Sequence, residues 1–167
     1  MKDILSLLIP VVSVFVSYFL GQRQSLRTFS KDQAKHRYES FYVPFFTMLY
    51  AGRVWARAPH SLNFDSRSKL LDMLTQNLAL LGPGLQACYP DLLDAHIRML
   101  EYDSGKSDQE AAPDAYDRVF KRIEAAAISE AKALSKELCL PPITHTYETC
   151  LRKSRAGKPT RTPAKLV

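Results

Sequence analysis

The chain has 167 residues, a hydrophobic fraction of 46% and a formal net charge of +6, from 23 Lys and Arg against 17 Asp and Glu. This length leaves room for one domain of about 100–120 residues beside shorter segments, which excludes several domains of ordinary size. The basic excess lies in two places: residues 22–57 carry seven Lys and Arg against two acids, and residues 141–167 carry six against one.

The first stretch is apolar. Residues 4–20 contain no charge, and twelve of these 17 residues are Leu, Ile, Val or Phe. As a helix that includes Gly21 the stretch is about 27 Å long, enough to cross a thin bilayer core. Its insertion free energy is on the order of −5 kcal/mol. We therefore predict a transmembrane anchor over residues 1–21. The alternative is a cleavable signal peptide, but the apolar region is long for one and no Ala-x-Ala site follows.

A basic segment follows the anchor, and no proline interrupts it before Pro44. We predict a juxtamembrane helix over residues 22–43. The positive-inside rule places the N-terminus outside the cell membrane and the C-terminal domain in the cytoplasm. In that reducing compartment the three cysteines are not expected to form disulfides. Four cations at four-residue spacing form a stripe predicted to contact anionic lipid. They are Arg23, Arg27, Lys31 and Lys35.

Small side chains recur at every fourth position of the anchor, at Ser13, Ser17 and Gly21. Such a strip lets two membrane helices approach closely and pack. The alternative is that serine and glycine are merely tolerated in the span. We predict self-association along this strip, and therefore a homo-oligomer.

Aromatic residues dominate the stretch around Pro44, which is predicted to be the centre of the core. Pro44 itself is expected to kink the helix or to begin a new one. An anchor and a basic neck followed by Arg37-Tyr38-x-x-Phe41-Tyr42-x-Pro44-Phe45 resembles the layout of many small uncharacterised single-span proteins of bacteria and prophages. The resemblance covers only residues 1–46; it implies a prokaryotic or phage source and supplies no catalytic residue.

The body is predicted to be all-α, a bundle of about four helices over residues 44–140. One helix is predicted over 65–81, where Gly82-Pro83 stops it, and another begins after Pro90. The longest begins at Pro113-Asp114 and ends before Pro141-Pro142, with one clean apolar stripe. The core-facing positions expected in the helix after Pro90 are Leu92, Leu93, His96, Ile97 and Leu100.

Residues 141–167 lose apolar periodicity and are predicted to be a disordered basic tail. Its cations would attract anionic lipid or nucleic acid without specificity. They are Arg152, Lys153, Arg155, Lys158, Arg161 and Lys165. Because Tyr147 is its one aromatic residue, the tail lacks the stacking platforms of a single-strand binder. We do not expect nucleic acid to be the main partner.

Three short patterns invite a chemical interpretation. Gly105-Lys106-Ser107 resembles the end of a phosphate loop, but residue 100 is Leu instead of the leading Gly. Two groups contain metal-ligating residue types: Asp91, Asp94 and His96, and Cys139, His145 and Cys150. In the first group the histidine points to another helix face. The second group has looser spacing than a zinc knuckle. The sequence therefore predicts no cofactor and no metal. It contains no catalytic motif and predicts no enzyme, with the alternative left open that catalytic groups converge from positions far apart in the chain.

The leading hypothesis is a membrane-anchored interaction or scaffold module that self-associates and binds an unknown protein partner. A first alternative is a membrane-perturbing effector or toxin, of phage defence or a prophage programme. A second is a membrane tether that binds nucleic acid or anionic lipid through the basic tail.

Overall fold

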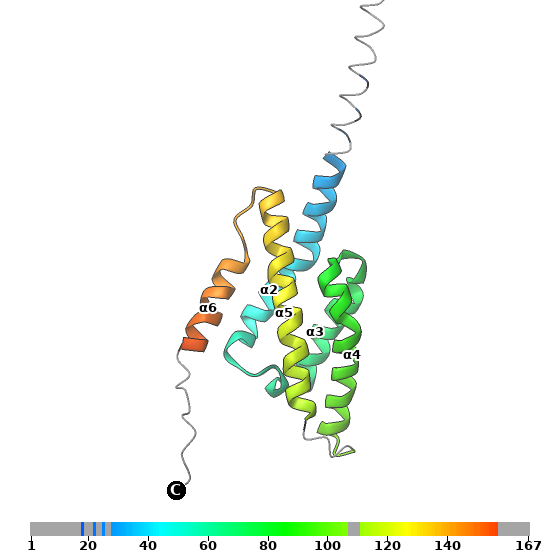
Figure 1. Ribbon diagram of the computed structural model, residues 1–167, viewed down its shortest axis with the longest axis vertical. Coiled ribbons are helices and arrows are strands. Elements are labelled where there is room, and N and C mark those ends of the chain that lie inside the picture. The colour runs from blue at the N-terminus through cyan, green and yellow to red at the C-terminus, as the bar shows by residue number, and fades with distance from the viewer. Residues whose placement is uncertain (1–17, 19–21, 23–24, 26–27, 107–110, 157–167) are drawn as a thin grey trace, which may run out of the picture.

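The computed structural model describes residues 18, 22, 25, 28–106 and 111–156 (Figure 1). This part of the chain is a helical bundle without strands. The α-helices are α2 (Val43–Ala51), α3 (Phe64–Gln76), α4 (Pro83–Asp103), α5 (Ala112–Glu137) and α6 (Thr144–Ala156). The short elements are the π-helical turn η1 (Tyr38–Tyr42) and the 3-10 turns η2 (Val54–Ala56), η3 (Pro59–Ser61) and η4 (Leu78–Leu80). In Figure 1, α5 runs through the middle, with α3 and α4 on one side of it and α6 on the other.

A single continuous helix leads from residue 28 through η1 into α2. Within η1 a backbone N–H donates to the carbonyl five residues before it, one residue farther than in an α-helix. The Val43 N–H accordingly donates to the Tyr38 carbonyl. Pro44 follows directly as the second residue of α2. Because a proline ring clashes with the carbonyl four residues before it, a wider turn at this point relieves the clash. The helix therefore passes Pro44 without a break.

The aromatic stretch forms the centre of the core, as the sequence predicts. Phe41, Tyr42, Phe45 and Phe46 are all almost fully buried, and the Phe41 and Phe45 rings stack with centroids 5.4 Å apart. Such ring pairs add about 0.5–1.5 kcal/mol each beyond their area burial. The stripe predicted on the longest helix also faces this core. Its buried members include Tyr116, Phe120, Ile123, Ala127, Ala131 and Leu134.

The N-terminus of α4 is capped from α5 by the Glu130 carboxylate. Its oxygens accept hydrogen bonds from the backbone N–H groups of Gly82 (3.1 Å), Gly84 (2.8 Å) and Leu85 (3.2 Å), and from the Tyr42 hydroxyl (2.6 Å). A Cβ at residue 82 would lie 2.3 Å from the Glu130 carboxyl carbon, so any residue other than glycine would displace this carboxylate from its position at the cap. Burial, and then the hydrogen bond to Glu130, raise the pKa of Tyr42 far above its usual range.

The boundaries predicted around α3 and α4 are corrected. The helix predicted over 65–81 ends at Gln76 and is followed by η4. Pro90 lies inside α4 and does not precede it. It is tolerated there because Pro90 and Gln86, the residue whose carbonyl loses its partner, both lie on the exposed face.

The core face predicted for this helix is also partly wrong. Leu93 and Ile97 are 39% and 47% exposed. The buried stripe of α4 is centred about 80° around the helix from the predicted face, so it keeps Leu92 and His96 and excludes Leu93 and Ile97. Its members are Leu85, Cys88, Leu92, Ala95, His96 and Met99.

The prediction of a disordered tail is wrong for residues 144–156, which form α6. Tyr147 is 1% exposed and meets the Phe46 ring edge to face at 5.7 Å. The burial of the Tyr147 ring holds α6 against the core, although most residues around Tyr147 in the sequence are polar. Residues 157–167, which include Lys158, Arg161 and Lys165, lie outside the described residues.

In the part of the chain that the structure describes, no helix has the length and apolar character needed to span a bilayer. The predicted anchor over 1–21 lies outside the described residues except for Tyr18. Its small-residue positions Ser13, Ser17 and Gly21 are outside as well, and so are Arg23 and Arg27 of the basic stripe.

Candidate functional site

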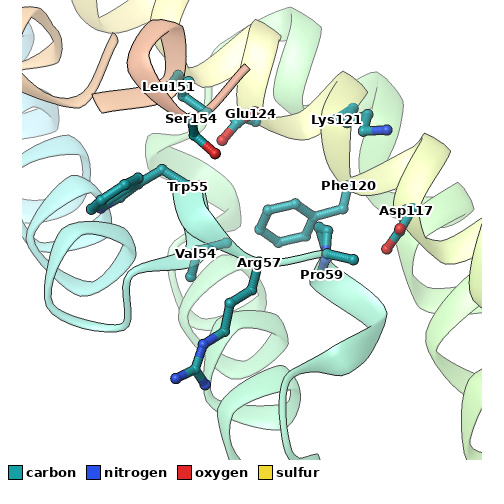
Figure 2. Close-up of a pocket in the computed structure, with 11 residues that line it drawn as sticks. Val54, Trp55, Arg57, Pro59, Asp117, Phe120, Lys121, Glu124, Leu151 and Ser154 are labelled. Carbon is teal, nitrogen blue, oxygen red and sulfur yellow. The ribbon is translucent and has the colours of Figure 1, made fainter. Parts of the chain in front are cut away.

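A hollow lies beside α6, where the chain after α2 passes under α5 (Figure 2). This first cavity has a volume of about 220 Å³. Figure 2 shows the Phe120 ring, the Glu124 carboxylate and the Ser154 hydroxyl directed towards it from α5 and α6. Its apolar walls come from η2, η3, α5 and α6 and from the loop between η2 and η3. The apolar residues are Val54, Trp55, Ala58, Pro59, Phe120 and Leu151.

A second cavity, of about 300 Å³, continues the first along the α5–α6 contact. The two share Lys121, Glu124 and Leu151. The second cavity is also lined by Ala125, Ile128, Glu148 and Arg152. We call the two cavities together the α6 groove.

The chain after α2 turns sharply to reach the α6 groove. Gly52 ends α2, and Arg53 adopts a left-handed conformation with φ +49°. This reversal lays η2 beside α6. On α5, Phe120, Glu124 and Ile128 follow each other at four-residue spacing, so they lie on one side of that helix.

Glu124 and Tyr147 hold α6 at the edge of the groove. The Tyr147 hydroxyl donates a hydrogen bond of 2.5 Å to Glu124, whose side chain is 8% exposed. Burial, and then the adjacent Glu124, raise the pKa of the Tyr147 hydroxyl far above its usual range. The carboxylate and the hydroxyl satisfy each other, which is what allows both groups to be buried.

The other two acids of the groove also have partners. Asp117 accepts hydrogen bonds from the His60 backbone N–H (2.8 Å) and pairs with the His60 ring (3.0 Å). Glu148 pairs with Lys132 on α5 at 2.6 Å. These contacts connect η3 and α6 to α5, and they leave the acids of the groove engaged within the chain.

The cations of the groove are different. Arg57, Lys121 and Arg152 are exposed, and none has an ion-pair partner among the described residues. Figure 2 shows the charged ends of Arg57 and Lys121 extending away from the cavity. The α6 groove therefore combines apolar side chains, interrupted by the Glu124 carboxylate and the Ser154 hydroxyl, with exposed cations at its rim.

The two cavities of the groove are small, each at or below the low end of the volumes, about 300–1,000 Å³, that hold small-molecule ligands. Beside Ser154, the described lining of the first cavity includes Glu124 and Lys121 and contains no histidine or cysteine. An apolar floor with a charged rim is the anatomy of a protein interface.

The predicted site residues fall in several places. Lys31 and Lys35 are exposed on the helix of residues 28–37 that precedes η1, which we call the neck helix. Lys35 pairs with Glu39 at 3.9 Å. Arg152 and Lys153 are exposed on α6, which also contains Arg155. Of Lys31, Lys35, Arg152 and Lys153, only Arg152 lines the α6 groove. The sequence does not indicate a functional role for Phe120, Lys121 or Arg57, because nothing in it shows that α5 meets α6.

The residues with metal-ligating side chains do not converge. Asp91 pairs with Arg122 at 2.6 Å and Asp94 with Arg98 at 2.9 Å, while His96 points into the core. Within the described residues, no cluster of three or more His, Cys, Asp or Glu side chains is arranged to hold a metal ion.

A buried polar cluster lies where the N-terminal end of α3 meets the C-terminal end of α4. Arg67 is 3% exposed, pairs with Asp103 and donates hydrogen bonds to the carbonyls of His60 (2.7 Å) and Leu62 (2.9 Å). Burial, and then the charge of Arg67, lower the pKa of His96. Burial also raises the pKa of Tyr116, which lies beside His96, to about 12. With its guanidinium directed to carbonyls of the chain itself, this cluster fixes the loop before α3.

No family model, curated protein or solved structure matches this chain.

Proposed function

We propose that this protein is a single-pass membrane-anchored helical protein that self-associates and acts as an interaction module for another protein. The observation that carries the proposal is the uncharged stretch of residues 4–20 with its one-sided basic flank. Such a stretch favours membrane insertion, and the flank favours a cytoplasmic C-terminal domain at the cell membrane.

The helix from residue 28 to Ala51 supports a scaffold role. It projects from the bundle at its described N-terminal end and has its C-terminal half in the centre of the core (Figure 1). Arg37 adds a hydrogen bond of 3.0 Å from its Nε to the Leu80 carbonyl. Because the connection is helical and packed, movement of the neck would be transmitted directly to the bundle.

The α6 groove supports protein binding over catalysis. Its floor is apolar, its rim is charged, and its two cavities are small. The cysteines Cys88, Cys139 and Cys150 are all free, which fits the reducing compartment proposed for the bundle.

Membrane anchoring is tested by cell fractionation with alkaline carbonate extraction. We expect the full chain to stay in the membrane pellet, and Val12→Asp to release it, because a charge in the span raises the insertion free energy by about 3 kcal/mol. Val12→Leu is the matched control and should stay in the pellet. Protease added to spheroplasts should leave the bundle intact. A wild-type chain recovered in the supernatant would refute the anchor.

Self-association is tested in a membrane two-hybrid assay. Ser17→Leu and Gly21→Leu should each weaken the signal, because a larger side chain keeps two helices apart. Val12→Leu, on the opposite face of the predicted helix, should leave the signal unchanged. A wild-type chain that gives no signal would refute the oligomer.

A further inference from the structure

We propose that the α6 groove binds an acidic amphipathic segment of the partner protein. This inference rests on the proposed function as an interaction module and names the chemistry of the partner. The segment would place apolar side chains on the partly exposed Leu151 and Ile128 and carboxylates against the cations of the rim.

The floor of the groove favours apolar side chains of the partner. Phe120 and Leu151 border the first cavity from opposite helices, and Ile128 continues the apolar surface into the second. Two adjoining hollows of about 220 and 300 Å³ each have room for one or two side chains. An amphipathic segment presents anchors at i, i+3, i+4 and i+7, a spacing that matches successive hollows along a helix pair.

The rim of the groove selects negative charge. Each acid in the groove already has a partner on the chain: Asp117 has His60, Glu124 has Tyr147, and Glu148 has Lys132. These hydrogen bonds leave the Asp117 and Glu124 charges in place, but both carboxylates are mostly buried. The cations of the rim are exposed and have no ion-pair partner among the described residues, so the charge that faces solvent at the rim is positive. Carboxylates of the incoming segment would complement it, and a basic segment would be repelled.

The position of the groove favours a protein over the bilayer. The neck helix leaves the bundle at the top of Figure 1, whereas η2, the C-terminal half of α6 and the N-terminal half of α5 lie towards the bottom. A bilayer approached along the neck would meet the opposite end of the bundle. The groove is therefore open to the side from which a cytoplasmic protein arrives.

The test uses the full chain in nanodiscs of neutral lipid and three fluorescent peptides of about 14 residues, long enough to form a helix in a groove. The first carries Leu and Phe anchors at i, i+3, i+4 and i+7 with Glu elsewhere. In the second, Lys replaces Glu; in the third, Ser replaces the anchors. By fluorescence anisotropy we expect the first peptide to bind at least about tenfold tighter than either of the others.

Two variants assign this binding to the groove. The double variant Lys121→Glu, Arg152→Glu should weaken binding of the first peptide by about tenfold or more, because it reverses the charge of the rim. Ala125→Trp should also weaken it by filling the second cavity from an exposed position. The double variant Lys69→Glu, Lys136→Glu makes the same change of charge at exposed positions outside the groove and should leave binding unchanged.

Three results would overturn the inference. The first is equal binding of the acidic and basic peptides, or unchanged binding to the double variant. The second is loss of peptide binding when the nanodiscs contain phosphatidylserine, which would show that the bilayer covers the groove. The third is tighter binding of duplex DNA than of the acidic peptide through Lys121 and Arg152. A chain that does not enter nanodiscs contradicts the proposed anchor alone, since the same peptides then test the groove on the chain in solution.

Discussion

Removing the Glu130 carboxylate should be among the most destabilising single changes in this bundle. Glu130→Ala leaves the N–H groups of Gly82, Gly84 and Leu85 without their cap, which costs about 0.5–2 kcal/mol. It also removes the acceptor of the Tyr42 hydroxyl, at about 1–3 kcal/mol. Glu130 is half-buried, so water replaces part of the loss. We expect the free energy of unfolding to fall by about 3 kcal/mol.

Glu130→Gln separates the two contributions. One oxygen of the carboxylate accepts from Gly84 and Leu85, and the other accepts from Gly82 and Tyr42. An amide keeps one acceptor and turns a donor towards the second pair. The loss should therefore be about half of that for alanine, roughly 1.5 kcal/mol.

The assay is equilibrium unfolding in urea, followed by the fluorescence of Trp55. This residue is the single tryptophan of the chain and packs against the core. Glu137→Ala is the matched control, because Glu137 is exposed near the end of the same helix. It should change the free energy of unfolding by less than about 0.5 kcal/mol. A loss of less than about 1 kcal/mol for Glu130→Ala would refute the view that this carboxylate stabilises the start of α4.

Three further predictions concern single positions. Cys139 has a φ of +56° at the end of α5, so Cys139→Gly should raise the free energy of unfolding by about 0.5–1 kcal/mol in the same assay, and a decrease would contradict the strain. Ile97→Gln should change it by less than about 0.5 kcal/mol because the side chain is exposed, whereas Leu92→Ala should lower it by about 2–5 kcal/mol; equal effects would place both residues on the same face. Burial lowers the folded-state pKa of His96, so the neutral ring contributes to the free energy of unfolding. This contribution is present above the ordinary pKa of about 6.5 and is lost as pH falls through the lower folded value. His96→Leu should flatten that part of the stability–pH curve, and an unchanged slope would exclude His96 as its source.

The parts of the fold that sequence predicts correctly are those with a long apolar period. α5 repeats its apolar positions over 26 residues, so the stripe that includes Phe120 is not ambiguous. The aromatic residues around Pro44 are also buried as predicted, since so dense a group has few other places in a small domain. In α4 the apolar residues nearly encircle the helix, and only packing decides that Leu92 is buried and Leu93 exposed.

α6 shows why composition misleads. Its basic and polar residues indicate a solvated tail, but Tyr147 gives it a place in the core against Phe46. The α6 groove follows from that same contact, because Leu151 and Arg152 form one of its walls. No local pattern indicates where α6 lies, so the groove is outside the reach of sequence. The Glu130 cap is similar, since it joins positions almost fifty residues apart.

The π-helical turn at Tyr38–Tyr42 determines the angular phase between the neck and the bundle. Each residue of an α-helix contributes about 100° of rotation and 1.5 Å of rise. Deleting one residue within this turn would convert it to regular α-helix, with α2 still anchored in the core by Phe45 and Phe46. Lys31 and Lys35 would then take a different direction relative to the α6 groove, set by the difference in winding between the π-helical and the α-helical turn. In the proposed membrane-anchored protein, this π-helical turn therefore sets the direction in which the groove faces relative to the neck.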